Sequence, residues 1–504
     1  MYRQYINLMM GRNTAFEMTI DTTKAGSASD TFILPAGNIG TYNAVIDWGD
    51  NTTSTITAYN DADLTHVYSV GGIYSVKING SFPEIKFNSS GDRLKLMSIN
   101  NWGINQWRRM EASFGGCNNL EIYATDIPDM SLCTSFFRAF NGCTSLTEIP
   151  NINQWNMQAA TTLRSMFDGT GLTGHLDLSG WQLLSCADLG TGGSFPFMNN
   201  TNITSLDVSN WNFRPAGTQF NYFINNCDSL TTITGMTTWQ NSDRVTNLTG
   251  FVQGCALISS LDFSGMDLSG CSSFQRFVYG NPSLNSLNLS GITLKSTGTV
   301  SLNLAFALCT SLTSITGIES FNSSAVNNLI GTFKDTGLTG DLDLTTWDVS
   351  NVTSLDSTFM GLSLDSLNIS GWDCGKVTTW GAKFSACFYG VNCPYIDVHN
   401  ITLRIAGVNL QYPWFSTNVN TRIYGLDTWD ISSATIMSDF ISGGRMTTPE
   451  YDATLIAWDT LIDAPDGLSV KFGSSQYTLG GASETSRNNL ISTDLWTITD
   501  GGGI

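Results

Sequence analysis

The sequence predicts a mainly β protein whose long central part is a stack of repeated coils. A short phrase returns thirteen times from Leu94 onward, at intervals of 26 to 31 residues. Its clearest copies are residues 172–181, 203–211 and 338–347. A fixed period of this length indicates one supersecondary unit copied in tandem. The flanking residues 14–90 and 446–504 lack the phrase, and we expect a separate domain at each end.

Each phrase begins with an apolar residue that we call the anchor. The anchors are Leu94, Leu120, Leu146, Leu172, Ile203, Leu230, Leu257, Leu284, Leu312, Leu338, Leu364, Cys393 and Asn420. After the anchor, apolar and polar residues alternate as in a half-buried strand. Many phrases close on an aromatic residue, as at Trp102, Trp155, Trp239, Phe321, Trp372 and Trp429. A large apolar residue stands six positions before many anchors, as at Phe114, Phe140, Met166, Phe197, Phe251 and Phe306. We therefore expect each coil to supply a short strand and an inward row of large side chains, with an irregular stack around Cys393 and Asn420.

Residues 91–445 resemble the BspA-type leucine-rich-repeat surface proteins. That family combines a Met-Phe pair, a Cys and a Leu-Asp-Leu-Ser-x-Trp phrase in a fixed order, and residues 166–181 and 333–352 match it closely. The resemblance implies a leucine-rich-repeat solenoid of about thirteen rungs. Such stacks build long display surfaces more often than closed catalytic pockets.

The segment 14–90 predicts a β-sandwich, because alternating apolar strands are separated by Gly, Asn and Asp turns. Residues 45–50, 66–68 and 72–78 are similar to a polycystic-kidney-disease (PKD) domain, which is an immunoglobulin-like module. The resemblance implies a spacer or adhesive unit. We expect His66 to make a structural hydrogen bond rather than bind a metal, since no second His or Cys is nearby. Residues 1–13 form a separate N-terminal segment.

The segment 446–504 predicts a small α/β cap that shields the last coil of the stack. Thr448, Pro449 and Glu450 are typical of a helix start. The apolar face of this helix would comprise Tyr451, Leu455, Trp458 and Leu461. We expect a strand over 468–472, a second helix over 483–491 and a last strand over 495–498.

Charge and composition exclude several classes of partner. The net charge is −19 and only 23 residues are Lys or Arg, whereas nucleic-acid binding needs clustered cations. We expect no membrane insertion, because no apolar segment is long enough to span a bilayer. Single acids recur in the repeats at Asp177, Asp207, Asp262, Asp343 and Asp348. We expect them to form a solvated surface rather than ordered calcium sites.

Cysteines recur at one register position, three residues before an anchor. They are Cys117, Cys143, Cys227 and Cys309. This placement predicts a reduced ladder of small buried groups rather than disulfides. Cys387 and Cys393 have no matching Cys or His pair, so we expect no zinc site there.

The residues that usually carry catalysis are scarce. His66, His175 and His399 are the three histidines, and we expect the last two to be exposed surface variants. No nucleophile elbow, phosphate-binding loop or zinc-protease motif is present. A glycoside hydrolase would need paired carboxylates, but Glu148 and Glu319 have no distinctive partner in sequence. The sequence therefore predicts no enzyme, no cofactor and no metal.

Residues 1–12 lack the apolar run of a secretory signal. Together with reduced cysteines, this favours a protein folded in a host cytoplasm and carried on a particle. We therefore expect a non-enzymatic phage virion surface protein, either a tail fibre or a head-exposed decoration. Its partners would be a host-surface glycan or protein and other virion proteins. The alternatives are a bacterial cell-surface adhesin of the same repeat family and a polysaccharide-degrading virion enzyme. Binding residues, oligomeric state and head or tail location stay open.

Overall fold

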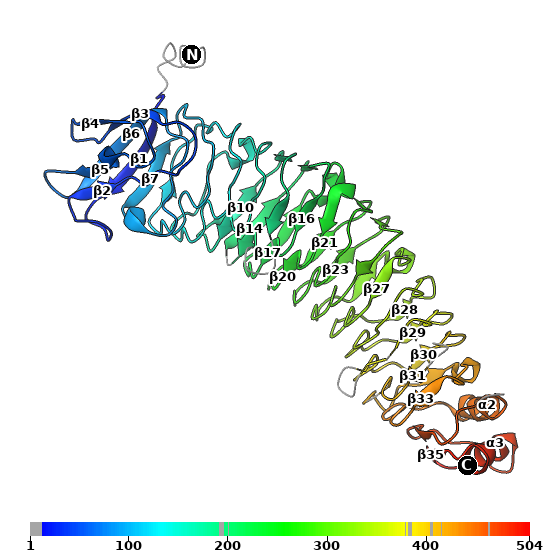
Figure 1. Cartoon of the computed structure of the whole chain (residues 1–504). Helices are drawn as coiled ribbons and strands as arrows, with labels where there is room; N and C mark the ends of the chain where they lie inside the picture. Colours follow the sequence, from blue (N-terminus) through cyan, green and yellow to red (C-terminus); the bar gives the residue numbers. More distant parts are fainter. Residues whose placement is uncertain are drawn as a thin grey trace. The chain divides into compact units, whose positions relative to one another are not determined.

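The computed structural model describes residues 13–190, 196–199, 201–378, 380–381, 386–403, 407–414, 416–461 and 464–504. Residues 1–12, nearly all of the expected N-terminal segment, lie outside this range. The chain divides into two compact units, Met1–Ile258 and Ser259–Ile504. Strands dominate both units, and the α-helices of the described chain are α2 (Thr448–Asp459) and α3 (Ala482–Ser492) (Figure 1). The protein is therefore mainly β, as the sequence predicts.

The first unit begins with six strands. They are β1 (Phe16–Asp21), β2 (Thr31–Ile33), β3 (Asn43–Asp47), β4 (Thr53–Ile56), β5 (Thr65–Val67) and β6 (Ile73–Ser81). One sheet has the order β4-β3-β6-β1-β7-β8, where β7 (Leu96–Asn101) and β8 (Glu121–Ile122) come from the first two coils. Strands β2 and β5 form a separate antiparallel pair. Because β1 pairs directly with β7, the six-stranded sheet extends from the N-terminal strands into the first coil, without a break at residue 90.

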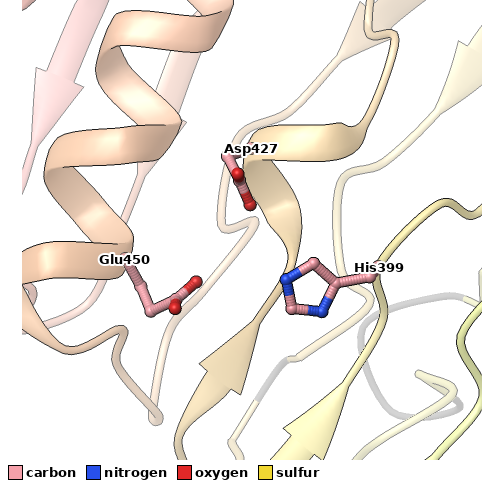
Figure 2. A group of neighbouring side chains, drawn as sticks. All are labelled: His399, Asp427 and Glu450. Carbon is pink, nitrogen blue, oxygen red and sulfur yellow. The ribbon is translucent and has the colours of Figure 1, made fainter.

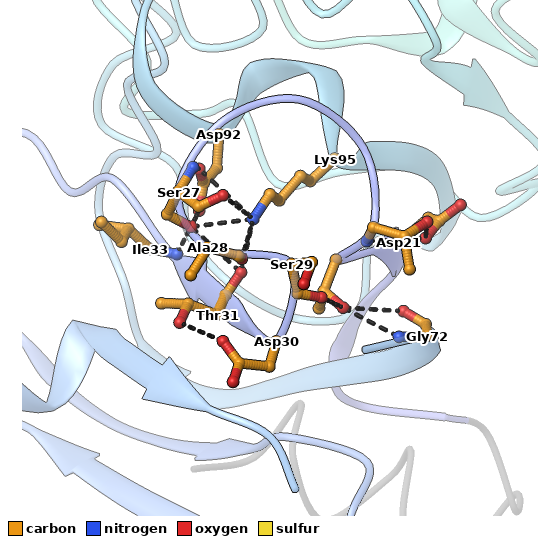
Figure 3. A network of polar contacts seen from close by, with 12 residues as sticks. Asp21, Ser27, Ala28, Ser29, Asp30, Thr31, Ile33, Gly72, Asp92 and Lys95 are labelled. Carbon is orange, nitrogen blue, oxygen red and sulfur yellow. Dashed lines mark hydrogen bonds and ion pairs between the residues drawn. The ribbon is translucent and has the colours of Figure 1, made fainter. Parts of the chain in front are cut away.

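A buried ion pair fastens a loop of the N-terminal strands to the first coil (Figure 3). The Lys95 ammonium donates to Ser27 Oγ at 2.9 Å and to backbone carbonyls of residues 27–31 at 2.7 to 3.1 Å. The Asp92 carboxylate accepts the backbone N–H groups of Ser27 and Ile33 at 2.6 and 2.7 Å. Burial lowers the pKa of Lys95, and the Asp92 charge opposes that shift. Both charges are thus fully bonded, as buried charges must be.

His66 has the structural role that the sequence predicts. Its ring stacks on Trp48 with centroids 4.8 Å apart and an interplanar angle of 3°. His66 Nε2 lies 2.8 Å from Asp50 Oδ2. The Tyr68 hydroxyl donates to the Trp48 carbonyl at 3.0 Å, which closes a compact aromatic cluster.

In the first unit, the coils pair through short parallel strands. These strands form the sets β10 (Thr173–Asp177), β14 (Asn202–Asp207) and β18 (Thr232–Thr234); β11 (Gln182–Leu183) and β15 (Asn212–Phe213); β12 (Asp188–Gly190), β16 (Thr218–Phe220) and β19 (Val245–Asn247); and β9 (Phe167–Asp168), β13 (Met198–Asn199), β17 (Ile224–Asn225) and β20 (Val252–Gln253). Leu176 pairs with Leu206, which pairs with Ile233, and all three side chains are buried. The prediction that the apolar residues of the phrase point into the core is therefore confirmed at these positions.

The second unit repeats this parallel arrangement. Its strands form the sets β21 (Ser260–Asp262), β23 (Ser286–Asn288) and β26 (Ser314–Thr316); β22 (Asp267–Leu268) and β24 (Thr293–Leu294); β25 (Val300–Ser301) and β27 (Val326–Asn328); β28 (Asp341–Asp343), β29 (Ser366–Asn368), β30 (Tyr395–Asp397) and β32 (Ile423–Tyr424); β31 (Val408–Asn409) and β33 (Ala434–Ile436); and β34 (Ser469–Lys471) and β35 (Thr497–Thr499). Leu342, Leu367, Ile396 and Ile423 form one buried row within this unit.

In several coils a tryptophan bonds to the coil before it. In the first unit, the indole N–H of Trp211 donates to the Leu178 carbonyl at 2.8 Å, and Trp239 donates to the Val208 carbonyl at 3.0 Å. In the second unit, Trp429 of the last phrase donates to the Val398 carbonyl at 2.8 Å. Trp458 of α2 makes the same bond to a carbonyl of the preceding coil, that of Leu426, at 3.1 Å. A buried indole N–H needs an acceptor, and in these coils the preceding coil supplies it, whereas the indole N–H groups of Trp102 and Trp155 are buried without a partner.

The recurring aspartates also accept backbone hydrogen bonds, a role in addition to the solvated surface expected for them. In each case a carboxylate oxygen accepts the backbone N–H of the residue two positions later, at 2.8 to 3.0 Å. The five are Asp177, Asp207, Asp262, Asp343 and Asp348. This Asx turn bends the chain at the end of a strand or an extended segment. The regularly spaced Asp residues therefore serve as turn acceptors in these coils, and Asn288 and Asn368 make the same bond in others.

The four cysteines of the expected ladder are buried, as the sequence predicts. All eleven cysteines are buried and none is in a disulfide. Cys143 Sγ donates to the Phe114 carbonyl at 3.0 Å, and Cys309 Sγ donates to the Val278 carbonyl at 2.9 Å. Burial raises the pKa of both thiols, so they stay protonated and unreactive.

Several local expectations are wrong. The Leu257 side chain is 52% exposed, and its neighbour Ile258 occupies the buried anchor position instead. The coil that starts at Leu146 has no strand in residues 146–155, so not every coil supplies one. The last strand begins at Thr497 because Leu495 has a φ of +58° and is exposed.

The C-terminal segment holds α2, α3, β34 and β35. Thr447 is the N-cap of α2 and accepts the Glu450 N–H, so the capping residue lies one position before the expected Thr448. Tyr451, Leu455 and Trp458 form the buried face of α2, as expected, whereas Leu461 lies beyond the end of the helix at Asp459 and is only half-buried. Among the described residues, neither helix has the length and apolar character needed to cross a membrane.

Candidate binding surface

A polar groove of about 270 Å³ lies between two successive coils of the first unit. Its lining consists of residues 147–153, residues 172–173, residues 175–177 and Ile203. The groove contains Glu148 and His175, two of the residues considered for catalysis from sequence. Both side chains are exposed.

Structural hydrogen bonds hold most polar groups of this groove. Asn153 Nδ2 donates to Asp177 Oδ2 at 2.7 Å, and the other oxygen of Asp177 accepts the Ser179 N–H. His175 Nδ1 lies 2.8 Å from Ser205 Oγ. Asp177 is therefore half-buried and bonded, rather than an outward group without contacts.

A smaller groove of about 120 Å³ contains Glu319 and Asp341 in the second unit. Asp341 accepts a hydrogen bond from Ser366 Oγ at 2.6 Å. Glu319 is exposed, like Glu148, whereas a general acid needs the desolvation that an apolar pocket provides. Both grooves thus have groups suited to binding hydroxyls but lack the environment of an activated acid.

An aromatic pair on β30 and β32 of the second unit combines the exposed Tyr395 with the half-buried Tyr424. The rings of Tyr395 and Tyr424 stack with centroids 4.4 Å apart and an interplanar angle of 30°. Tyr395 is 40% exposed, and its hydroxyl donates to Asp397 Oδ2 at 3.2 Å. Burial raises the pKa of Tyr395, and the Asp397 charge adds to this shift. Stacked rings beside a carboxylate suit a sugar, whose apolar face packs on the ring while its hydroxyls bond to the acid.

His399 follows β30 and is not the isolated surface variant expected from sequence. Asp397 Oδ1 accepts the backbone N–H of His399 at 3.0 Å and lies 2.6 Å from its Nδ1. Although burial opposes the shift, these bonds hold the pKa of Asp397 below its usual value. The fold also places His399 beside Asp427 and Glu450. Sequence reasoning missed this cluster because its members lie 28 and 23 positions apart, on separate elements.

Comparison with known proteins finds a family model and a solved structure that match this chain. A family model described as "Mycoplasma protein of unknown function, DUF285" matches residues 84–191 and 300–390. A crystal structure of a leucine-rich repeat protein from Bacteroides ovatus ATCC 8483 matches with 14% sequence identity and a TM-score of 0.30. That match covers 83% of this chain and 91% of the other chain. No curated protein matches significantly.

Proposed function

We propose that this chain is a non-enzymatic surface protein that recognises a host surface. The observation that carries the proposal is the Tyr395–Tyr424 stack, in which Tyr395 is exposed and Asp397 lies beside it. Parallel strands fix both rings in advance, so little conformational entropy is lost when a sugar packs on them. The polar groove around Glu148 and His175 offers further hydroxyl-binding groups in the first unit.

The proposal includes the following architecture. Residues 14–90 act as a PKD-like spacer, residues 91–445 form a solenoid of about thirteen rungs, and residues 446–504 cap its end. The Trp458 bond to the Leu426 carbonyl supports the cap, because α2 takes the place of a further coil in the tryptophan series.

We place the protein on a virion, as a tail fibre or a head-exposed decoration. The reduced, buried cysteines support this location, since a protein folded in a reducing cytoplasm keeps its thiols. The alternative is a bacterial cell-surface adhesin. Capsid and tail genes beside this gene favour the virion, whereas a neighbouring export or sorting system favours the adhesin.

Glycan binding by the full chain tests the proposed recognition. A panel of bacterial surface polysaccharides is immobilised, and the affinity of the wild type is compared with that of Tyr395→Ala and Tyr424→Ala. Loss of one stacked ring should weaken binding about 3- to 10-fold. Tyr123→Ala is the matched control, because Tyr123 is 62% exposed and lies in the other unit. An equal loss in all three variants, or no binding by the wild type, contradicts the glycan proposal.

A further inference from the structure

Three potential metal ligands converge in the second unit. His399 follows β30, Asp427 belongs to the 3-10 turn η7 (Leu426–Thr428), and Glu450 lies in the first turn of α2. One ligand atom from each residue lies within 4.8 Å of the others (Figure 2). We propose that these side chains bind a divalent transition-metal cation of the Zn²⁺ class, which fastens α2 to the last two coils.

The histidine is oriented as a metal ligand would be. Its Nδ1 contacts Asp397 Oδ1 at 2.6 Å, and its Nε2 lies on the side of Asp427 and Glu450 (Figure 2). With the proton on Nδ1, the lone pair on Nε2 faces the two carboxylates. Metal-binding histidines commonly donate their second N–H to a carboxylate, which fixes the ring and its tautomer.

Gly425 allows the ring and the glutamate to meet. Its φ is +93°, and a Cβ at this position would lie 2.5 Å from His399 Cγ. The Gly425 N–H donates to Glu450 Oε2 at 3.3 Å, so one oxygen of the glutamate is already oriented. A side chain at residue 425 would therefore displace the proposed ligand His399.

The protein itself satisfies the two carboxylates of the cluster only in part. Asp427 Oδ1 is buried without a hydrogen-bond partner, which is costly for a charged oxygen. Among the described residues, no Lys or Arg forms an ion pair with Asp427 or Glu450. A bound cation would satisfy the buried oxygen and neutralise both charges.

The donor set selects the class of metal. Imidazole with carboxylates suits Zn²⁺ and its transition-metal neighbours, whereas Ca²⁺ prefers oxygen ligands throughout. Zn–N and Zn–O bonds are about 2 Å long, so ligand atoms on one ion lie roughly 3 to 4 Å apart. Small rotations of the half-buried side chains would bring the three ligands to that separation. Three protein ligands leave the fourth position of a tetrahedral ion open to water.

Zinc binding by the full chain tests this site independently of glycan binding. Protein freed of metal by a chelator is titrated with Zn²⁺, and bound metal and melting temperature are measured. We expect His399→Gln and Glu450→Gln to bind one Zn²⁺ fewer than the wild type and to lose the Zn²⁺-dependent rise in melting temperature. Asp397→Asn should bind Zn²⁺ about 10- to 100-fold more weakly.

His175→Gln is the matched control, because His175 is an exposed histidine bonded to Ser205 in the other unit. It should bind as much Zn²⁺ as the wild type. If His399→Gln fails to fold, Glu450→Gln decides, since its amide oxygen can still accept the Gly425 N–H. Equal stoichiometry and equal melting shifts in the wild type and Glu450→Gln would overturn the site. A larger shift with Ca²⁺ than with Zn²⁺ would overturn the metal class.

Discussion

Glu84 should make the first unit less stable as the pH rises, and Glu84→Gln should remove that effect. The side chain is fully buried, and neither carboxyl oxygen has a hydrogen-bond partner. The nearest cationic group is the Arg109 guanidinium, whose Nε lies 3.9 Å from Oε1. Burial raises the pKa of Glu84 to about 7, although Lys86 and Arg109 oppose the shift. The buried carboxyl is therefore protonated in acid and becomes a costly buried charge above neutrality.

The direction and size of the change in stability follow from the pKa values of Glu84 in the folded and the unfolded chain. The folded chain holds the Glu84 proton more tightly than the unfolded chain, whose carboxyl keeps the ordinary pKa of 4.5. Its contribution to stability is fully present below pH 4.5 and is lost as the pH rises to about 7. A shift of this size corresponds to about 3 kcal/mol. Glutamine keeps the shape and never ionises, so Glu84→Gln should equal the wild type in acid and exceed its stability at pH 8 by up to about 3 kcal/mol.

Urea unfolding of the wild type and Glu84→Gln at pH 4, 6 and 8 measures this difference. Glu148→Gln is the control, because Glu148 is exposed and should show the same small difference from the wild type at every pH. A Glu84→Gln variant that is less stable than the wild type at pH 8 would refute the reasoning, as would a difference that does not change with pH.

Three further predictions concern the coils. Leu176→Ala should cost about 2–5 kcal/mol by leaving a cavity, and Leu176→Asp should unfold the surrounding coils in thermal melts; full stability of either variant would disprove the inward position. Asp177→Ala should cost about 1–3 kcal/mol in urea, because the bonds to Ser179 and Asn153 are lost; an unchanged midpoint would mean that the Asx turn contributes nothing. Thiols such as Cys143 should resist alkylation until the chain unfolds, and reductant should leave the melting temperature unchanged; bridged cysteines in mass spectra of unreduced protein would contradict this.

The sequence predicts the inward side of the coils because that side depends on a period. Leu176, Leu206 and Ile233 recur at one register, and a parallel ladder aligns residues of equal register. The prediction that Leu257 is a buried anchor is wrong for a local reason. Two apolar residues stand side by side there, and periodicity alone does not decide which one is buried. The predicted start of the last strand at Leu495 is wrong, because the backbone of Leu495 is left-handed and the strand begins only after it.

The polar side of the coils is harder to predict from sequence. An aspartate that accepts a backbone N–H and one that only faces water occupy the same polar position in a strand pattern. Asp207 is recognised as a turn acceptor only once its distance to the Ser209 N–H is known. The cluster of His399, Asp427 and Glu450 depends on the stacking of two coils and a helix, which no local spacing encodes. The sequence-based expectation of no metal therefore rested on motifs that place ligands close together in the chain.

The indole bonds between successive coils have a consequence for how such a chain changes over generations. Trp211 and Trp239 each donate to the coil before them, and the acceptor is a main-chain carbonyl that every coil possesses. Removing residues 203–229 would give Trp239 the place of Trp211, with the Leu178 carbonyl as its acceptor. Recombination between similar repeats can therefore shorten or lengthen the array by whole coils without a compensating substitution. The reach of the protein and the set of exposed groups it carries can then vary in steps while the internal bonding pattern stays the same.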